Sequence, residues 1–569
     1  MIKYFLATLL VAVLSACANL QATSQHLADK VLLNANIYTV NQAQPWAQAV
    51  AIAKGKIVYV GDDVGAQRWI GSKTLAQDLQ GKFLLPGFVD AHSHIFLGGA
   101  HMDDLVLNPK ADIATWLQEV KDYSQANPSK KIIIGSGFLS STFGADGPNK
   151  AMLDAVVPDR PVFIMDEGMH GAWLNSAALT VLKITAETPD LSNFDYYKRD
   201  SRGEPTGYIL EGTVWQAMSA LNANTVQSVA EGTAKVIDLY NSYGVTAVFD
   251  AGPWDAKDIQ LDVLEELESQ DALTIRFQGS QYIDNIDDKD TIVDELLRLQ
   301  SKSQGTRHPI NVLKIMVDGT VEGQTAAMFN AYQNDADNFG ESVFTPAQLN
   351  SLVDEASSKN IDVHFHALGD RAISESLDAI ALAKNNHPDS SARFTISHIQ
   401  VMADKDIPRF AQLGVIAQSS LLWAAGDEQG EKFLSADQFQ RYYRFNSLLN
   451  AGVTLSFGCD FSSHGGGLEG IAPLYNMEVG HTRQLVGSPS SMMQPLAKEK
   501  LSIASLIYGY TMGGAYQMRL EHEIGSIEVG KRADMVLLDE NLFMVKPYRI
   551  HKVQVLKTWL DGELVFSKL

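Results

Sequence analysis

The sequence predicts an α/β protein built on a parallel β-sheet, of the kind that closes into a (β/α)8 TIM barrel. Three observations predict this class. Apolar strand-like runs alternate with helical stretches through most of the chain. Polar side chains able to bind metal recur at the ends of those runs, where a barrel carries its chemistry. The 569 residues are 46% hydrophobic and 20% charged, an ordinary globular balance with enough chain for a large core.

The first residues are typical of an exported bacterial lipoprotein. Residues 1–17 contain one lysine, an apolar stretch of signal-peptide length and small residues ending in "LSAC". That ending resembles a bacterial lipobox, so cleavage is expected to free the amine of Cys17 and lipid to modify its thiol. An ordinary cleaved signal with an incidental cysteine is the alternative. Residues 18–28 would form a polar tether, placing the protein on the periplasmic side of a membrane or at the outer membrane.

The charge and cysteine content restrict the partners. A formal net charge of −22 with no basic run argues against nucleic acid, which is bound through clustered lysine and arginine. Besides Cys17, the chain has only Cys459, so no internal disulfide is expected after lipidation. The expected partners are a small-molecule substrate, a membrane through the lipid at Cys17, and a second copy of the chain in a homodimer.

Short β runs with Asn, Gly and Asp turns are expected near both ends of the chain, in residues 29–83 and 523–569. Between them, helical stretches such as residues 345–360 and 370–386 separate apolar runs, and this alternation predicts βα units. The runs, in chain order, are "GKFLLPGFVD", "KKIIIGSG", "RPVFIMDE", "GVTAVFDAG", "TIRFQGS", "INVLKIMVDG", "IDVHFHALGD", "RFTISHIQ", "GVIAQSS" and "GVTLSFGCD".

Two histidines follow the first of these runs, in "PGFVDAHSHIFLGGAH". Side chains alternate faces along a strand, so His92 and His94 point the same way and converge on one point. Convergent imidazoles suit a metal ion, although a solvent-facing or hydrogen-bonded pair is the alternative.

Later runs supply partners for this pair. His398 could be a core histidine, Asp460 a helix N-cap and Lys314 half of a buried ion pair. Their joint recurrence on strands is nevertheless what a barrel active site predicts. Cys459 precedes Asp460 and should point away from the site, which argues against a cysteine nucleophile. The candidates on later strands are Lys314, His366, His398 and Asp460.

The sequence resembles the amidohydrolase superfamily, in particular the branch that contains N-substituted formamide deformylase and YtcJ-like proteins. The resemblance implies a metal-dependent (β/α)8 barrel over residues 84–522 and a small β-sandwich built from residues 29–83 and 523–569. It runs from "GKFLLPGFVDAHSH" to "IGSIEVGKRADMVLLD" and includes, in order, "RPVFIMDEGMHGAWLNSAAL", "PTGYILEG", "YGVTAVFDAG", "LKIMVDGT", "HFHALGDRAI", "FTISHIQ" and "LSFGCDF".

The resemblance assigns metal ligands to the strand-end residues. Lys314 matches a lysine that can be carboxylated to bridge two metals, and Asp460 matches an aspartate that faces the metal and handles the proton of the attacking water. Zinc is the default divalent ion for a mostly imidazole site, with one or two ions bound, and iron, manganese or cobalt are alternatives. The implied histidine ligands are His92, His94, His366 and His398.

The stretch "MDEGMHGAWLNSAAL" matches residues that this branch places near substrate. His170 is the expected hydrogen-bond donor to the developing oxyanion. Asp166 is the expected family acid, with its neighbour Glu167 as the alternative because the spacing to His170 is longer than in many relatives. Trp173 and Asn175 are expected near substrate, and a core tryptophan and a helix cap are the alternative interpretations.

Glu211 in "YILEG" and Asp318 in "VDGT" are expected to contact substrate or to orient the metal ligands. His364 shares a strand face with His366 and is expected to support the ligands or to pack beside them.

These parts imply hydrolysis of a carbon–nitrogen bond other than a peptide bond, in an amide or N-substituted formamide-like substrate, by a metal-activated water. Hydrolysis of an ester or lactone in the same site is one alternative. A regulatory or metal-binding relative without turnover is the other.

Overall fold

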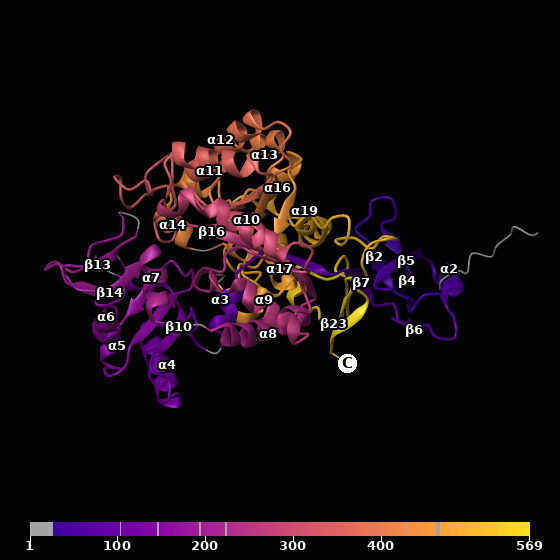
Figure 1. Ribbon diagram of the computed structural model, residues 1–569, viewed down its shortest axis with the longest axis horizontal. Helices are drawn as coiled ribbons and strands as arrows, with labels where there is room; N and C mark the ends of the chain where they lie inside the picture. Colours follow the sequence, from indigo (N-terminus) through magenta and orange to yellow (C-terminus); the bar gives the residue numbers. More distant parts are fainter. Residues whose placement is uncertain are drawn as a thin grey trace, which may run out of the picture.

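The structure is a computed structural model that describes residues 27–102, 104–144, 147–192, 195–221, 225–426, 428–462 and 467–568. The predicted signal peptide, Cys17 and residues 18–26 of the tether lie outside this part of the chain. Figure 1 shows a central barrel with a β domain at one end and an inserted lobe at the other. No helix among the described residues has the length and apolar character needed to cross a membrane.

Eight parallel strands form the barrel sheet, which confirms the predicted fold class. Each overlaps a run that the sequence predicted as a strand, and β8 and β16 continue past the ends of their runs, to Ser93 and Ile283. In sheet order they are β8 (Phe88–Ser93), β15 (Val245–Asp250), β16 (Arg276–Ile283), β17 (Ile310–Met316), β18 (Asp362–Ala367), β19 (Phe394–His398), β20 (Ile416–Ser419) and β21 (Leu455–Phe457).

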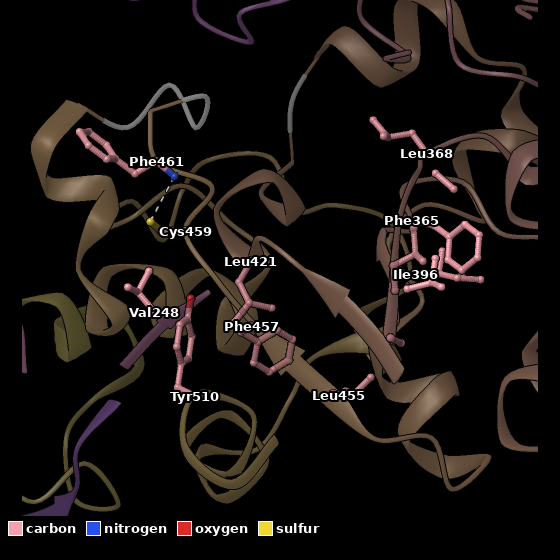
Figure 2. Close-up of a cluster of buried hydrophobic side chains, with 14 of the residues drawn as sticks. Val248, Phe365, Leu368, Ile396, Leu421, Leu455, Phe457, Cys459, Phe461 and Tyr510 are labelled. Atoms are coloured by element: carbon pink, nitrogen blue, oxygen red, sulfur yellow. Dashed lines mark hydrogen bonds between the residues drawn. The ribbon is translucent and has the colours of Figure 1, made fainter. Parts of the chain in front are cut away.

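Helices surround this sheet and pack on it through one apolar core. Figure 2 shows part of that core, where Phe365 and Ile396 of neighbouring strands lie together and Phe457 faces Tyr510. The principal barrel helices are α3 (Ile95–Ala100), α8 (Val226–Ser242), α9 (Gln260–Ser269), α10 (Ile292–Ser303), α11 (Pro346–Ser358), α12 (Asp370–Asn386), α13 (Ile407–Leu413), α14 (Glu428–Phe433), α15 (Ala436–Phe439), α16 (Phe445–Asn450), α17 (Pro473–Thr482), α18 (Ile503–Tyr508) and α19 (Gly514–Gln517).

The first and last barrel strands, β8 and β21, meet at a seam held by specific polar contacts. The Asp460 amide donates to the His92 carbonyl at 2.8 Å. The buried carboxylate of Asp90 accepts from the amides of His92 at 3.1 Å and Cys459 at 3.2 Å. Gly458 fits because an added Cβ would lie 2.4 Å from the His92 nitrogen. The seam therefore places His92 and Asp460 side by side.

An inserted lobe between β8 and β15 corrects one prediction. Residues 133–138 and 162–166, expected among the strands of the parallel barrel sheet, belong instead to a separate mixed sheet. The strands of both sheets have the same local pattern of apolar residues, so the sequence did not distinguish lobe strands from barrel strands. The lobe's strands are β9 (Leu105–Val106), β10 (Ile133–Phe138), β11 (Val162–Asp166), β12 (Gly171–Leu174), β13 (Tyr197–Arg199) and β14 (Pro205–Leu210), with helices α4 (Ile113–Ala126), α5 (Lys150–Asp154), α6 (Ser176–Leu182) and α7 (Gly212–Leu221).

The β domain joins segments from both ends of the described chain, indigo and yellow in Figure 1. Antiparallel pairing of β7 with β22 sets Leu85 opposite Val536. Side chains from both of its sheets, including Val50, Leu84 and Trp559, share one buried cluster. The two sheets have the orders β5-β4-β1-β6 and β24-β23-β22-β7-β2-β3. Their elements are β1 (Lys30–Leu33), β2 (Asn36–Tyr38), β3 (Trp46–Ala47), β4 (Ala49–Ala53), β5 (Lys56–Gly61), α2 (Asp63–Ala66), β6 (Leu75–Asp78), β7 (Phe83–Pro86), β22 (Met535–Leu538), β23 (Val555–Leu560) and β24 (Glu563–Ser567).

Candidate active site

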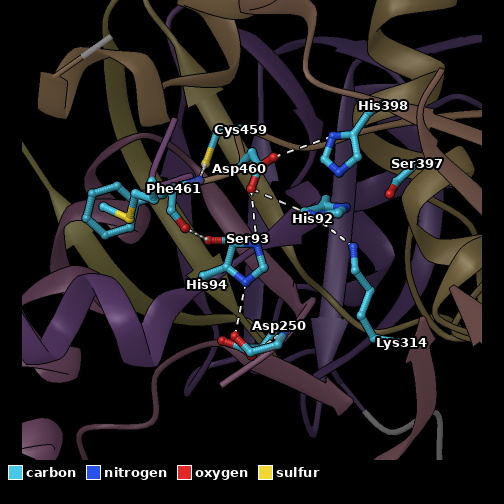
Figure 3. Close-up of polar contacts among 12 residues, drawn as sticks. His92, Ser93, His94, Asp250, Lys314, Ser397, His398, Cys459, Asp460 and Phe461 are labelled. Carbon is cyan, nitrogen blue, oxygen red and sulfur yellow. Dashed lines mark hydrogen bonds and ion pairs between the residues drawn. The ribbon is translucent and has the colours of Figure 1, made fainter. Parts of the chain in front are cut away.

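The predicted metal ligands converge at the carboxyl ends of the barrel strands. Asp460 lies at their centre (Figure 3). Its Oδ1 atom is 3.1 Å from His94 Nε2 and 3.7 Å from His92 Nε2. Its Oδ2 atom is 3.6 Å from His398 Nδ1. One carboxylate thus contacts three imidazoles that come from two strands, and all four side chains are buried.

Lys314 and His366 complete this cluster. The Lys314 ammonium nitrogen is 3.5 Å from His92 Nε2, and the rings of His366 and His398 are 4.5 Å apart. Burial lowers the pKa of Lys314 from 10.5 to about 7, so a neutral amine is accessible near neutral pH. The structure therefore brings together all six residues that the sequence singled out as ligands.

The chemistry of this donor set fits a divalent metal ion. Asp460 Oδ1, His366 Nδ1 and both ring nitrogens of His398 are buried without a hydrogen-bond partner in the described part of the chain. Burial, reinforced by the charge of Lys314, holds the pKa of His92 well below its ordinary value. Neutral imidazole is the form that binds metal, and a mostly imidazole set suits zinc. Bound metal would supply the partners that these buried atoms lack.

Neighbouring groups orient the candidate ligands. His364 Nε2 lies 2.9 Å from His92 Nδ1, in the supporting role expected for it. The Gly252 carbonyl lies 3.0 Å from His94 Nδ1. These contacts engage the Nδ1 atoms, which leaves Nε2 of both rings toward Asp460.

Several residues of the site have a left-handed backbone, which is costly for side chains other than glycine. His398 has φ 71°, Asp460 has φ 60° and Trp254 has φ 37°. Such strain persists where the surrounding structure holds it, and it clusters at functional positions. Here it lies in the turns that leave β19, β21 and β15 and aim these side chains at one point.

A cavity of about 170 Å³ opens beside the candidate ligands. Residues of the inserted lobe and of the loops after the barrel strands form its walls, and most of them are apolar or aromatic. Besides the candidate ligands, its walls include Phe138, Leu139, Ser140, Ser141, Asp166, Glu167, Met169, His170, Tyr208, Leu210, Trp215, Trp254, Tyr282, Met316, Thr320, Glu322, Leu368, Gln400 and Trp423.

His170 enters this cavity from the loop between β11 and β12. Its Nδ1 lies 2.6 Å from Glu211 Oε2, and Thr325 Oγ1 donates to Glu211 Oε1 at 2.8 Å. Burial favours the neutral ring, but the Glu211 carboxylate outweighs it and raises the pKa of His170 to about 9. His170 is therefore a cation at neutral pH, with Nε2 as the ring nitrogen able to donate to a ligand.

Asp166 also lines the cavity, where it accepts a hydrogen bond from Ser140 Oγ at 2.8 Å and from the His170 amide at 3.0 Å. It therefore fixes the loop that presents His170. Glu167 lines the same wall.

Four predicted substrate-binding residues lie outside the cavity walls, and one of them, Glu211, acts through His170. The other three have contacts elsewhere. Trp173 is fully buried in the inserted lobe, where its Nε1 donates to the Asn149 carbonyl at 2.9 Å. Asn175 caps α6 by accepting from the Ala178 amide. Asp318 accepts from three backbone amides and lies 3.7 Å from His366 Nδ1. Trp173 is therefore a core residue, Asn175 a helix cap and Asp318 a support for the loop beside His366. None of the three belongs to the substrate site.

Of the cavity residues that the sequence did not indicate, four lie close to the candidate ligands or form a polar corner of the wall. The ring centroids of Trp254 and His94 are 3.9 Å apart, with the ring planes tilted by 38°. Those of Trp423 and His398 are 5.4 Å apart, so the two tryptophans flank the ligands. Glu322 and Gln400 form a polar corner of the wall. All four follow barrel strands within a few residues of "FDAG", "MVDG", "ISH" and "AQSS", so extending the strand-end rule into the loops could have found them.

The parallel barrel and its strand-end cluster of imidazoles, lysine and carboxylate define a metal-dependent hydrolase. Residues 76–566 match the amidohydrolase family, and the chain belongs to that family.

The chain is also similar to individual proteins of different described roles. The exoenzymes regulatory protein AepA of Pectobacterium carotovorum is 32% identical over 74% of this chain and 91% of its own. The N-substituted formamide deformylase of Arthrobacter pascens is 26% identical over 95% of this chain and 99% of its own. An uncharacterized metal-dependent hydrolase from Pyrococcus horikoshii has a similar structure, with a TM-score of 0.71 at 24% identity, over 91% of this chain and 99% of its own.

Proposed function

We propose that this protein hydrolyses a carbon–nitrogen bond other than a peptide bond, in an amide or N-substituted formamide-like small molecule. The observation that carries the proposal is the position of Asp460, whose buried carboxylate lies between three imidazoles and which lines the cavity. The similarity to an N-substituted formamide deformylase supports the choice of bond.

Two residues of the chain would carry the chemistry. A divalent ion, zinc by preference, would lower the pKa of water and polarise the substrate carbonyl. Asp460 takes the proton from the attacking water and delivers it to the leaving nitrogen. His170, held as a cation by Glu211, donates a hydrogen bond to the carbonyl oxygen as negative charge develops there.

Lys314 would determine whether one ion or two are bound. Its pKa of about 7 leaves the neutral amine available to react with carbon dioxide. The reaction would release a proton and give a carbamate, an anionic oxygen ligand that could help to hold a second ion. We propose this modification because Lys314 adjoins His92 and is buried in the cluster.

Two alternatives use the same geometry. An ester or lactone has a carbonyl that this site would polarise in the same way. A regulatory role without turnover is suggested by the relative named an exoenzymes regulatory protein, but the complete set of candidate ligands favours catalysis. Substrate profiling of protein with a defined metal content, using amides, formamides, esters and lactones, separates the three. Turnover of esters alone, or of nothing, would contradict the proposal.

A further inference from the structure

One corner of the cavity presents two hydrogen-bond acceptors to whatever occupies it. Glu322, in the connection after β17, accepts from Gln400 Nε2 at 2.7 Å and from the Tyr442 hydroxyl at 3.2 Å. Gln400 is 3% exposed and follows β19 by two residues. Glu322 and Gln400 both line the cavity, beside the candidate ligand His398.

The amide of Gln400 has a fixed orientation, because only its nitrogen can donate to the Glu322 carboxylate. Its oxygen is then left buried in the cavity wall, with no hydrogen-bond partner in the described part of the chain. A buried acceptor that is left without a donor destabilises the protein, so a ligand that brings a donor to it gains affinity. The corner is therefore complementary to a group rich in N–H donors.

The charges around the cavity define that group further. No cationic side chain in the described chain comes within ion-pair distance of Glu322, whose two hydrogen-bond donors are both neutral. Asp166 and Glu167 add further carboxylates to the walls, and Lys314, in the metal cluster, is the one lysine or arginine among the wall residues described. His170 and Lys314, the cationic wall residues described, lie on the side of the candidate ligands, so a carboxylate or phosphate placed at Glu322 would find no hydrogen-bonded cation there.

We propose that Glu322 and Gln400 form a subsite for a cationic nitrogen group, a primary ammonium or a guanidinium, carried by the substrate away from the bond that is cleaved. Glu322 supplies the charge and the Gln400 oxygen supplies a second acceptor. The choice of an amide bond rests on the proposed function, whereas the charge preference rests on the cavity alone.

The test uses three alkyl hydroxamates of equal chain length that end in an ammonium, a methyl or a carboxylate group. Hydroxamates bind a metal centre whichever bond the enzyme cleaves, so affinity for the metal-loaded full chain reports the subsite independently of turnover. We expect the ammonium compound to bind about tenfold more tightly than the methyl compound, with the carboxylate weakest. Shorter and longer chains in the same series allow for the reach between the metal and Glu322.

Variants assign the preference to these residues. Glu322→Gln should abolish it with the fold intact, and Glu322→Asp should retain part of it. Gln400→Leu should reduce it. Glu341, like Glu322, is exposed and lies in the same connection, but it is outside the cavity walls, so Glu341→Gln should leave the preference unchanged. Thermal unfolding of each variant monitors folding.

Equal binding of the ammonium and methyl compounds at every chain length would overturn the subsite, as would a preference that survives Glu322→Gln. Matched formamides and esters with the same three end groups separate this failure from failure of the proposed function. Turnover of ammonium esters but of no amide would sink the amide assignment and leave the subsite standing. Turnover of the formamides at equal rates for all three end groups would support the amide assignment and contradict the subsite.

Discussion

Asp460 contacts three of the candidate ligands at once, and its left-handed backbone aims it at them. Two roles are therefore combined in one side chain, as a possible ligand and as a proton carrier. Asp460→Asn keeps the shape and removes the charge. We expect turnover to fall by about 10²- to 10⁴-fold, the usual range for a general base, with metal retained and unfolding little changed. Near-normal turnover by a folded, metal-loaded variant would exclude the proton-transfer role.

The stabilising interaction between His170 and Glu211 should depend on pH, because it requires the protonated imidazole. The folded-state pKa of His170, about 9, is raised above the ordinary 6.5, so its stabilising charge is fully present below pH 6.5 and is lost as pH rises through about 9. Glu211→Gln should lower this pKa and remove that part of the pH dependence of unfolding. NMR titration of His170 in the metal-free protein measures the shift. A titration midpoint unmoved by Glu211→Gln would mean that another group charges the imidazole.

At this scale the sequence could predict which side chains converge at the candidate metal site, and it indicated His170 and Asp166, but it did not indicate most of the cavity wall. His92 and His94 were recognisable because strand periodicity puts them on one face. Trp254 and Glu322 lie in loops, where no period relates position in the chain to direction. Trp173 and Asn175 resembled substrate residues but pack within the inserted lobe, because a motif records neighbours in sequence and not which of them face a cavity.

Among the secondary-structure elements, the barrel strands were predictable because each is a short apolar run followed by a polar or glycine-rich turn. The inserted lobe was not, since β10 and β11 are also parallel neighbours with the same local pattern. Sheet membership depends on pairing partners far away in the sequence, and a single sequence does not state them. The segment between β8 and β15 is long enough to hold its own sheet, so its length, rather than its residue pattern, could have indicated an inserted lobe.

The seam between β8 and β21 can be tested at Gly458. A methyl group there would lie 2.4 Å from the His92 nitrogen and 2.6 Å from Asp90 Oδ1. We expect Gly458→Ala to lower the free energy of unfolding by about 1–3 kcal/mol and to weaken metal binding, because it separates His92 from Asp460. Gly168→Ala is the control, since its methyl would have no neighbour closer than 3.9 Å. Metal titration and denaturant unfolding measure the two effects. An unaltered metal affinity in Gly458→Ala would show that the seam does not position the candidate ligands.

For the whole molecule, bound metal should contribute to stability, since its ligands come from separate strands of one barrel. Chelation should lower the thermal midpoint and added zinc should restore it, with a gain of about 4 kcal/mol at a thousandfold excess over Kd. Replacing both His92 and His94 by alanine should abolish this response. A melting profile indifferent to chelation, in protein that contained metal beforehand, would contradict the assignment of these ligands.

The proposed lipid anchor concerns the molecule's place in the cell. If Cys17 is acylated, the mature protein should fractionate with membranes, and Cys17→Ser should alter processing or release the globular part. Because the candidate site residues lie between His92 and Asp460, the proposed hydrolytic activity should persist in the released form. Mass spectrometry of the mature N-terminus checks the modification. Unmodified Cys17 in correctly processed, freely soluble protein would refute the anchor.

The candidate ligands extend from His92 near the start of the barrel to Asp460 after its last strand. A ribosome must therefore release most of the chain before the site can exist, and until then the two early histidines offer an ion only a weak pair of contacts. Loading is consequently a late event in the life of each molecule. The ion that binds is therefore one that is available where the barrel closes. The compartment in which folding is completed, rather than the one in which synthesis begins, then determines the metal content of the protein.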